Sequence, residues 1–508
     1  MRAYVFDIET YRKLDNRKLT DKRDKIGNIE FGLAVIKVLN RDKFYVFEDK
    51  ESFKNFILSL VENKHKEKIY FIGFNIYNFD NFTFFNNIEL VKYFDILINK
   101  NYKILSMFSK NKKIVLYDLF NIFPLSLKEL GKYVNLEKGN MQKELAIMDK
   151  DEFEQRKKEI VEYCKQDVVI TEKIFNEFYD FLNKNGITSL PLTPSQLSFK
   201  LYNLLNGNKI NGKEINNDYL FLESYYGGRT EYFYLGKFNK SIYAYDFNSL
   251  YPFVMVRYKY PVEFVKSEVL PDYDNFIRDI YNFEGLGIFE IYAENTIYYL
   301  DNDRKIEIGL LPYKYNEKII YPKGKWIGIY NLNEIKFSIE NGYKVKPLYV
   351  EYWKSEKLNR IDEFVSYWYN IKKQKKGLLS VIAKIVLNSL YGKFMQINQG
   401  YDIKLLESEE DYFNYEVIED GLNIGINRNT GMERGRSTFL SIGSYITSYA
   451  RIELLKKMKE AIKKNAKILY CDTDSLFLDN KVFQDEKDLG KVKIEKEGKN
   501  ITIFSAKS

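Results

Sequence analysis

The chain has 508 residues, with 79 basic and 71 acidic side chains that give a formal net charge of +8. A hydrophobic content of 45% can support several buried cores, and the mild positive charge suits local phosphate-binding patches. One histidine and two cysteines exclude a zinc module and argue against a disulfide scaffold. No run of 18 apolar residues and no signal peptide occur, so we expect a soluble cytoplasmic protein with no membrane partner.

An alternating, strand-like run opens the chain and points Asp7 and Glu9 to the same face. A third acid, Asp80, ends another run, and further on Tyr163 and Asp167 lie one turn apart in a helical stretch. Four carboxylates and a tyrosine suit two-metal hydrolysis of a phosphodiester, in which Tyr163 orients the attacking water. For the opening run alone, a solvated strand end is the alternative.

Segments that alternate between strand and helix patterns continue to about residue 185. A loop from Asn185 to Pro194, with two prolines and a glycine, then marks a domain boundary. Beyond this loop, an aromatic strand-like run leads to Asp246, and Pro252 favours a turn or a helix start shortly afterwards.

Four lysines that include Lys372 and Lys376 precede a second candidate segment. In that segment Lys384, Asn388 and Tyr391 fall on one face at helical pitch, at spacings of four and then three residues. The preceding lysines suit contacts with a triphosphate and a template strand, with a solvated helix face as the alternative.

Near the end of the chain, Asp472 and Asp474 stand between two apolar runs, as at the tip of a strand hairpin. Two like charges so close together are costly to bury without a divalent cation, so the pair predicts a magnesium site; an acidic turn is the alternative. Together with Asp246 and the helix that bears Lys384, the pair makes a workable site for nucleotidyl transfer by two metal ions.

These segments resemble three motifs of the family B DNA polymerases. The segment from Asp246 to Pro252 is similar to DxxSLYP, that from Lys384 to Gly392 to KxxxNSxYG, and that from Tyr470 to Ser475 to YxDTDS. The resemblance implies a DNA-directed DNA polymerase with two Mg²⁺ ions per active site, for which Mn²⁺ can substitute. Its substrates would be dNTPs, and its partners a DNA template and a primer strand.

The resemblance also implies roles for single residues. Asp246 and Asp474 would bind the metal ions, and Asp472 would support the same cluster. Tyr251 would lie beneath the deoxyribose and exclude a 2′-hydroxyl, although plain core packing is the alternative for this ring. The other implied nucleotide-binding residues are Ser249, Leu250, Lys372, Lys376, Lys384 at the triphosphate, and Asn388 and Tyr391 in the base-pair pocket.

The amino-terminal acids resemble the exonuclease motifs DIE, NxxxFD and YxxxD of the same polymerases. This resemblance implies an active 3′–5′ proofreading exonuclease in which Tyr163 assists. Its metal ligands would be Asp7, Glu9, Asp80 and Asp167.

Shorter segments resemble the protein-primed branch of the family. The segment from Ser126 to Leu130 is similar to its SLxxh element, that from Lys138 to Met141 to its Kxxh element, and that from Tyr225 to Gly228 to its YxGG element. A helix cap, a surface lysine and a turn are the respective alternatives. The branch implies a terminal protein as primer and a catalytic role for Lys138. It also implies DNA contacts by Asn75, Phe79, Ser126, Leu127, Tyr225, Gly227 and Gly228.

We therefore expect an α/β multidomain fold with an α+β palm. An RNase H-like exonuclease domain would be followed by the palm and fingers of a right-hand polymerase. The expected boundaries are 1–185 for the exonuclease, 195–260 and 439–508 for the palm, 353–394 for the fingers, and 261–352 and 395–438 for two terminal-protein-region-like insertions.

The end of the chain departs from the family pattern. Lys507 has the surroundings of the family's primer-binding KxY lysine, but the tyrosine and the thumb domain that should follow are missing. We therefore expect a truncated chain, or a thumb supplied by another chain, with low processivity. Three alternatives stay open: a family B polymerase that uses nucleic-acid primers or none, a nuclease only, and a truncated copy that binds DNA without synthesis.

Overall fold

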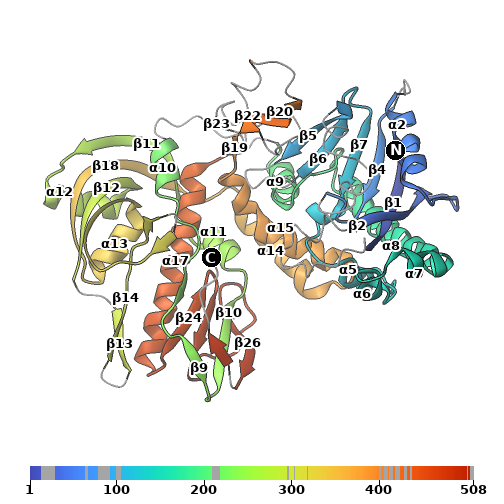
Figure 1. Cartoon of the computed structure of the whole chain (residues 1–508). Helices are drawn as coiled ribbons and strands as arrows, with labels where there is room; N and C mark the ends of the chain where they lie inside the picture. The colour runs from blue at the N-terminus through green and yellow to red at the C-terminus, as the bar shows by residue number, and fades with distance from the viewer. Residues whose placement is uncertain are drawn as a thin grey trace. The chain divides into compact units, whose positions relative to one another are not determined.

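A computed structural model of the chain contains two compact units, each assembled from separate stretches of sequence (Figure 1). The first comprises residues 1–201, 370–386 and 397–434, and the second residues 202–369, 387–396 and 435–508. The structure describes all residues except 13–28, 63–66, 78–91, 99–103, 209–217, 295–296, 302–303, 317, 400–401, 406–409, 411–415, 418–423, 428–431, 435–437, 500 and 504–508.

The first unit is built on a seven-stranded sheet with the strand order β3-β2-β1-β4-β7-β6-β5. Strand β4 runs parallel to both β1 and β7, and the remaining neighbours pair antiparallel. The strands are β1 (Arg2–Arg12), β2 (Ile29–Val38), β3 (Phe44–Phe47), β4 (Ile69–Gly73), β5 (Phe94–Ile98), β6 (Ile104–Ser109) and β7 (Ile114–Asp118).

Helices cover both faces of this sheet. Successive side chains of β1 point alternately toward the two helical layers. Phe6 belongs to a buried core with Phe53 and Ile57 of α2 (Lys50–Glu62). Asp7 points the other way, where the Sγ of Cys164 in α8 (Lys157–Lys184) lies 3.5 Å from its carbonyl oxygen. Shorter helices of this part of the chain are η1 (Leu119–Asn121), α5 (Leu127–Tyr133), α6 (Gln142–Leu145), α7 (Lys150–Gln155) and α9 (Pro194–Leu205).

Residues 397–434 add short antiparallel strands to the first unit. They form one two-stranded and one three-stranded sheet. These strands are β19 (Ile397–Gln399) with β23 (Met432–Arg434), and β20 (Asp402–Leu405), β22 (Ile424–Asn427) and β21 (Glu416–Val417).

The second unit contains a five-stranded antiparallel sheet with the strand order β26-β10-β25-β24-β8. Helix α17 (Leu440–Lys463) contacts β24, β25 and helix α11 (Leu250–Arg257), and most of its length is buried. The strands are β8 (Thr230–Tyr232), β10 (Ile242–Phe247), β24 (Ile468–Asp472), β25 (Ser475–Leu478) and β26 (Val492–Gly498).

A four-stranded sheet with the order β11-β18-β12-β17 forms the other large part of the second unit. It is built from β11 (Tyr260–Val269), β12 (Glu284–Ala293), β17 (Gly324–Asn331) and β18 (Lys344–Glu356), with helices α10 (Asp218–Glu223), α12 (Tyr273–Asn282) and α13 (Leu332–Glu340) beside it. Three further strand pairs complete the unit: β13 (Ile297–Asp301) with β14 (Arg304–Ile308), β15 (Tyr313–Tyr315) with β16 (Lys318–Ile320), and β9 (Gly236–Phe238) with β27 (Ile501–Ile503).

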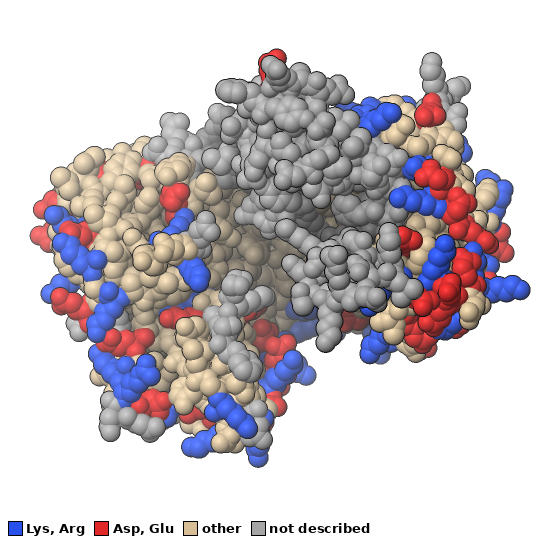
Figure 2. Space-filling model, viewed as in Figure 1, with Lys and Arg blue, Asp and Glu red and all other residues tan. Residues whose placement is uncertain are grey.

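Lysines and arginines are interspersed with aspartates and glutamates over the described part of the face in Figure 2. This mixture on the visible face agrees with the small net charge of +8. Among the described helices, none is both long and apolar enough to span a membrane.

Candidate active sites

Acidic side chains gather between β1 and α8 in the first unit. A carboxylate oxygen of Asp7, one of Glu9 and the Sγ of Cys164 lie within 4.8 Å of one another. Burial, and then the negative charge of Asp167, raises the pKa of Asp7 to about 7. A divalent cation would stabilise carboxylates whose ionised forms are so costly, so this donor set fits a metal with oxygen ligands.

Lys138 contacts the same group of acids. Its Nζ forms a buried ion pair with Asp167 and lies 5.1 Å from the centre of the Tyr163 ring. Burial lowers the pKa of Lys138, but the charges of Asp167 and Asp7 together outweigh burial. The net shift of the pKa is upward, so the ammonium group stays protonated. Gly139 lets the backbone approach the same ring, because a Cβ there would lie 2.8 Å from Cδ2 of Tyr163. The lysine therefore orients both an acid and the tyrosine.

These side chains line a cleft of about 880 Å³. Asn75, Ser126 and Leu127, which the sequence singled out as DNA contacts, line it as well. Ser126 also begins helix α5: its Oγ accepts the N–H of Glu129, and the Glu129 carboxylate accepts the N–H of Ser126. The position of Ser126 is thus compatible both with a DNA contact and with the helix-cap alternative.

Asp118, which sequence reasoning missed, positions Asn75 in the lining of this cleft. Its buried carboxylate accepts the N–H groups of Asn75 at 2.7 Å and of Tyr77 at 3.1 Å. Asn75 has a φ of 65°, a left-handed conformation that these bonds stabilise. An aspartate at the end of a buried strand and at a helix N-cap is the signal that could have found it.

In the second unit, acids from two distant segments meet on adjacent strands. Asp246 of β10 lies opposite Ser475 of β25, and the N–H of Phe247 donates to the carbonyl of Asp474 at 2.8 Å. Asp472 ends β24, and the N–H of Asp474 lies 2.6 Å from the Asp472 carbonyl across the tight turn. The structure therefore contains the expected hairpin and pairs it with the strand that bears Asp246.

Electrostatics make this second group of acids a candidate metal centre. Burial, and then the charge of Asp246, raises the pKa of Asp474 to about 6. Lys493 of β26 partly balances the cluster, since its Nζ lies 3.3 Å from Oδ2 of Asp246. Sequence reasoning missed Lys493, which faces Asp246 across a strand pairing that no local pattern reveals. Carboxylates without histidine or cysteine ligands fit Mg²⁺ or Mn²⁺.

Two tyrosines pack beside these acids. The ring centres of Tyr251 and Tyr391 lie 4.1 Å apart at an interplanar angle of 38°. Burial is the main reason that both have raised pKa values, and the charge of Asp474 contributes to each. Tyr225 is a third tyrosine near this pair. Burial raises its pKa, and the nearby Tyr391 raises it as well. Ser249, with a φ of 58°, starts the turn into α11 that brings Tyr251 to this place.

The expected fingers residues lie on helices α14 (Ile361–Gln374) and α15 (Leu378–Phe394). Lys384 and Asn388 are exposed on α15, one turn apart, as the spacing predicted. Lys372 lies near the end of α14, and Lys376 is exposed between the two helices. Leu250, by contrast, is buried at the start of α11, which is a place for packing.

The segment Gly227–Thr230 packs against the turn between β24 and β25, and we call it the cradle segment. A Cβ on Gly228 would lie 2.6 Å from Oγ1 of Thr473, so only glycine lets the two backbones approach this closely. The N–H of Thr473 donates to the carbonyl of Arg229 at 2.7 Å. Thr230 donates from Oγ1 to Oδ1 of Asp472 at 3.1 Å. Gly228 therefore packs against the acidic turn, and its expected DNA contact stays a prediction.

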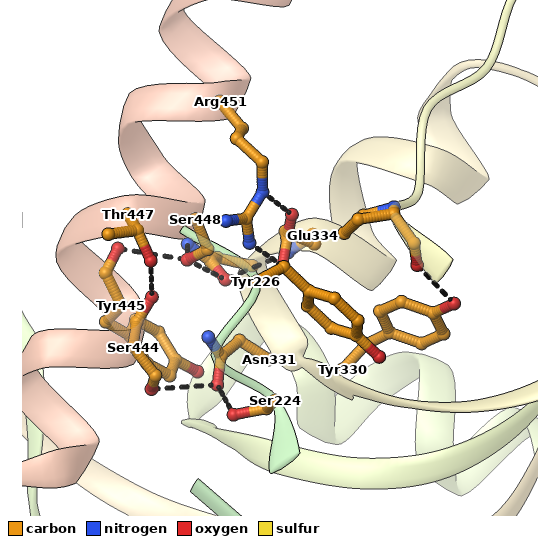
Figure 3. A network of polar contacts seen from close by, with 12 residues as sticks. Ser224, Tyr226, Tyr330, Asn331, Glu334, Ser444, Tyr445, Thr447, Ser448 and Arg451 are labelled. Carbon is orange, nitrogen blue, oxygen red and sulfur yellow. Dashed lines mark hydrogen bonds and ion pairs between the residues drawn. The ribbon is translucent and has the colours of Figure 1, made fainter. Parts of the chain in front are cut away.

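A buried polar network of side chains from α13 and α17 supports the cradle segment (Figure 3). Arg451 of α17 forms two hydrogen bonds with the Glu334 carboxylate, at 2.9 and 2.8 Å, and both side chains are almost fully buried. The third guanidinium nitrogen donates to the carbonyl of Gly227. The ring of Tyr226 stacks on that of Tyr330, at 5.6 Å, beside this ion pair. Helices α13 and α17 thus hold the start of the cradle segment.

Three residues that the sequence singled out lie outside the described residues. They are Phe79, Asp80 and Lys507.

The motifs and the fold lead to one class of protein. The family model of DNA polymerase type B, organellar and viral, matches residues 140–480, which is more than half of the chain. The chain therefore belongs to this family, as its motifs predicted.

Individual relatives refine the comparison. The chain is 27% identical over 399 residues to a probable DNA polymerase of Podospora anserina, covering 69% of this chain and 31% of that protein. It is 24% identical over 424 residues to the DNA-directed DNA polymerase of Enterobacteria phage PRD1, covering 77% and 65%. The chain spans about a third of the length of its relatives from Podospora anserina and Neurospora intermedia, 31% and 36%.

A solved structure shares the fold. Phi29 DNA polymerase complexed with primer-template DNA superposes with a TM-score of 0.70 at 16% sequence identity, over 99% of this chain and 86% of that one. This likeness confirms the expected α/β multidomain fold with exonuclease, palm and fingers. The expectation about the thumb and the detailed domain boundaries stay predictions.

Proposed function

We propose that the chain is a DNA-directed DNA polymerase with a 3′–5′ exonuclease. The observation that carries the proposal is the meeting of Asp246, Asp472 and Asp474 on paired strands, in a chain of this family. The acids around Asp7 and Glu9 in the first unit support a separate hydrolytic site.

At the polymerase site, Asp246 and Asp474 would hold Mg²⁺ ions, with Mn²⁺ as a substitute and with Asp472 in support. When bound, such ions stabilise the charge that develops during nucleotidyl transfer. Tyr251, packed on Tyr391, would form the floor beneath the deoxyribose and leave no room for a 2′-hydroxyl.

The remaining residues of this site would bind the nucleotide and the DNA. Lysines carry the charge that a triphosphate needs, and an exposed amide suits a base-pair pocket. We assign Lys372, Lys376 and Lys384 to the triphosphate, Asn388 to the base pair, and Tyr225 and Gly227 to the template side.

At the exonuclease site, Asp7, Glu9 and Asp167, with Asp80, would hold the metal ions. Tyr163 would orient the attacking water, and Lys138 would keep Tyr163 and Asp167 in place. The cleft beside them is lined by Asn75, Ser126 and Leu127, which suits a DNA single strand that enters with its 3′ end.

Primer extension tests the main proposal. Wild-type protein should extend a primed DNA template with dNTPs in Mg²⁺, and Asp474→Asn should abolish extension while leaving degradation of single-stranded DNA intact. Asp7→Ala should have the opposite pattern. A wild-type chain that degrades DNA but never incorporates a nucleotide would support a nuclease only, and the main proposal would be wrong. No activity of either kind would favour the non-catalytic alternative.

Initiation from a terminal protein is the finer part of the proposal. It is supported by the likeness to the polymerase of phage PRD1 and by the four-stranded sheet of residues 260–356, which coincides with the first expected insertion. A radiolabelled first dNTP should become covalently attached to a purified partner protein. Labelling of nucleic-acid primers alone would favour the other priming modes. The cytoplasmic location stays a prediction.

A further inference from the structure

The turn that carries Asp472 and Asp474 is held by Arg229, which is a basic residue outside the sequence motifs. We propose that Arg229 is a positioning residue for nucleotidyl transfer: its buried guanidinium fixes the cradle segment and thereby the orientation of the two aspartates. This inference rests on the polymerase function proposed above.

The side chain of Arg229 is anchored on several sides. Its Nε donates to the carboxylate of Glu231 at 3.0 Å, and its Nη1 donates to the carbonyl of Gly309 at 2.8 Å. The guanidinium carbon Cζ lies 3.8 Å from the centre of the Tyr321 ring. The fork of the guanidinium can make these contacts simultaneously, whereas an ammonium group or an apolar side chain cannot. Arg229 thus ties β8 to the segments that follow β14 and β16.

The backbone of the same residue contacts the acidic turn. Its carbonyl accepts the N–H of Thr473, which has a φ of 56°. A threonine in this left-handed region is strained unless its surroundings hold it. Gly228 and Thr230 contact Thr473 and Asp472 from either side of Arg229. A shift of the guanidinium therefore reaches the turn through a single residue.

Burial argues that this arrangement is more than packing. Arg229 is 1% exposed, and removing a guanidinium from water is costly unless its contacts are well made. Its ion-pair partner Glu231 keeps 27% of its side chain exposed, so loss of the arginine leaves a carboxylate that water can still reach. Substitution of Arg229 should therefore loosen the cradle segment without unfolding the second unit, to which it belongs.

Hydrogen–deuterium exchange of the metal-free protein tests the inference directly. We compare wild type with Arg229→Met and Arg229→Lys, and use Arg278→Met, which removes an exposed arginine of the same unit, as the matched control. The amide of Thr473 should exchange about tenfold faster in Arg229→Met, because its hydrogen bond weakens. The change should be smaller in Arg229→Lys and absent in the control.

A Mg²⁺ titration of primer extension gives the second measurement. Arg229→Met should need a several-fold higher Mg²⁺ concentration for half-maximal rate and should have a lower kcat, with KM for dNTP and exonuclease activity close to wild type. If Arg229→Met also loses exonuclease activity, it is misfolded and Arg229→Lys decides.

Unchanged exchange at Thr473 together with an unchanged Mg²⁺ requirement would overturn the inference. If wild type fails to synthesise DNA, the polymerase proposal is wrong, and the exchange at Thr473 still decides whether Arg229 holds the turn.

Discussion

The ring of Tyr251 at the start of α11 packs on the ring of Tyr391 near the end of α15, with their centres 4.1 Å apart. The two residues belong to different motifs, and both lie within the electrostatic reach of Asp474. One wall next to the acids is therefore made of two mutually supporting rings, which gives it a fixed position.

This wall should select the sugar of the incoming nucleotide. Tyr251→Val removes the ring and should raise kcat/KM for a ribonucleotide, relative to its matching deoxyribonucleotide, by at least about tenfold. Tyr251→Phe retains the ring and should discriminate as wild type does. Single-nucleotide incorporation kinetics measure the ratio. If the valine variant discriminates like wild type, the ring has only a packing role.

Asp7 should make the stability of the metal-free protein depend on pH. Its pKa rises from 3.8 to about 7 on folding, so the folded state binds the proton more tightly than the unfolded state does. Its contribution to stability is present below about pH 4 and is lost as the pH rises through 7, by up to about 4 kcal/mol.

Denaturation in EDTA at pH 5 and pH 8 measures this effect. Wild type should lose more stability between the two pH values than Asp7→Asn, which has no titrating group there. Added Mg²⁺ at pH 8 should stabilise wild type more than the variant. Identical pH dependence of the two proteins would show that Asp7 is not the group responsible.

Lys138 should be needed for the exonuclease and not for the polymerase. Lys138→Met leaves Asp167 buried without its ion-pair partner and frees the Tyr163 ring, so degradation of single-stranded DNA should fall about 100-fold. Lys128→Met is the matched control, because Lys128 lines the same cleft at an exposed position. Primer extension should be close to wild type in both. Equal loss in the two lysine variants would point to general DNA attraction instead.

Gly228→Ala should impair synthesis by displacing the acidic turn. The added Cβ would lie 2.6 Å from Oγ1 of Thr473, closer than real side chains approach, so primer extension should slow about tenfold or more. The double variant Gly228→Ala, Thr473→Gly removes the opposing side chain and also suits the positive φ, so it should recover most of the rate. Failure of this rescue would mean that Gly228 serves another surface, such as the DNA.

Much of the fold and of both sites could be predicted from the sequence, because the chemistry sits on short local patterns. A strand alternates, so Asp7 and Glu9 had to share a face; a helix repeats, so Lys384 and Asn388 had to share another. Asp7 and Asp246 lie within strands, and Asp167 lies within a helix, and the apolar neighbours of each can be read from the sequence. The family resemblance then joined segments that local patterns alone leave separate.

The residues that support the sites could not be predicted in the same way. Glu334 and Arg451 are 117 positions apart, and neither belongs to a pattern that names its partner. Lys493 meets Asp246 only through strand register, and Arg229 reads as one more polar residue after two glycines. Such contacts depend on strand register and on the packing of segments that are distant in the sequence, neither of which local periodicity reveals.

The pairing of β10 with β25 has a consequence for which changes of length this protein can accept. Asp246 and Ser475 are paired because β10 and β25 keep one continuous register from Tyr243 and Leu478 onward. Deleting a single residue within β10 would turn Asp246 to the opposite side of the sheet and erase the chemistry. Adding or removing residues in a loop between β11 and β18 leaves this register unchanged, as long as Gly309 and Tyr321 keep their contacts with Arg229, and Glu334 its ion pair with Arg451. Changes of length in such loops should therefore be tolerated where a single deletion within β10 is not.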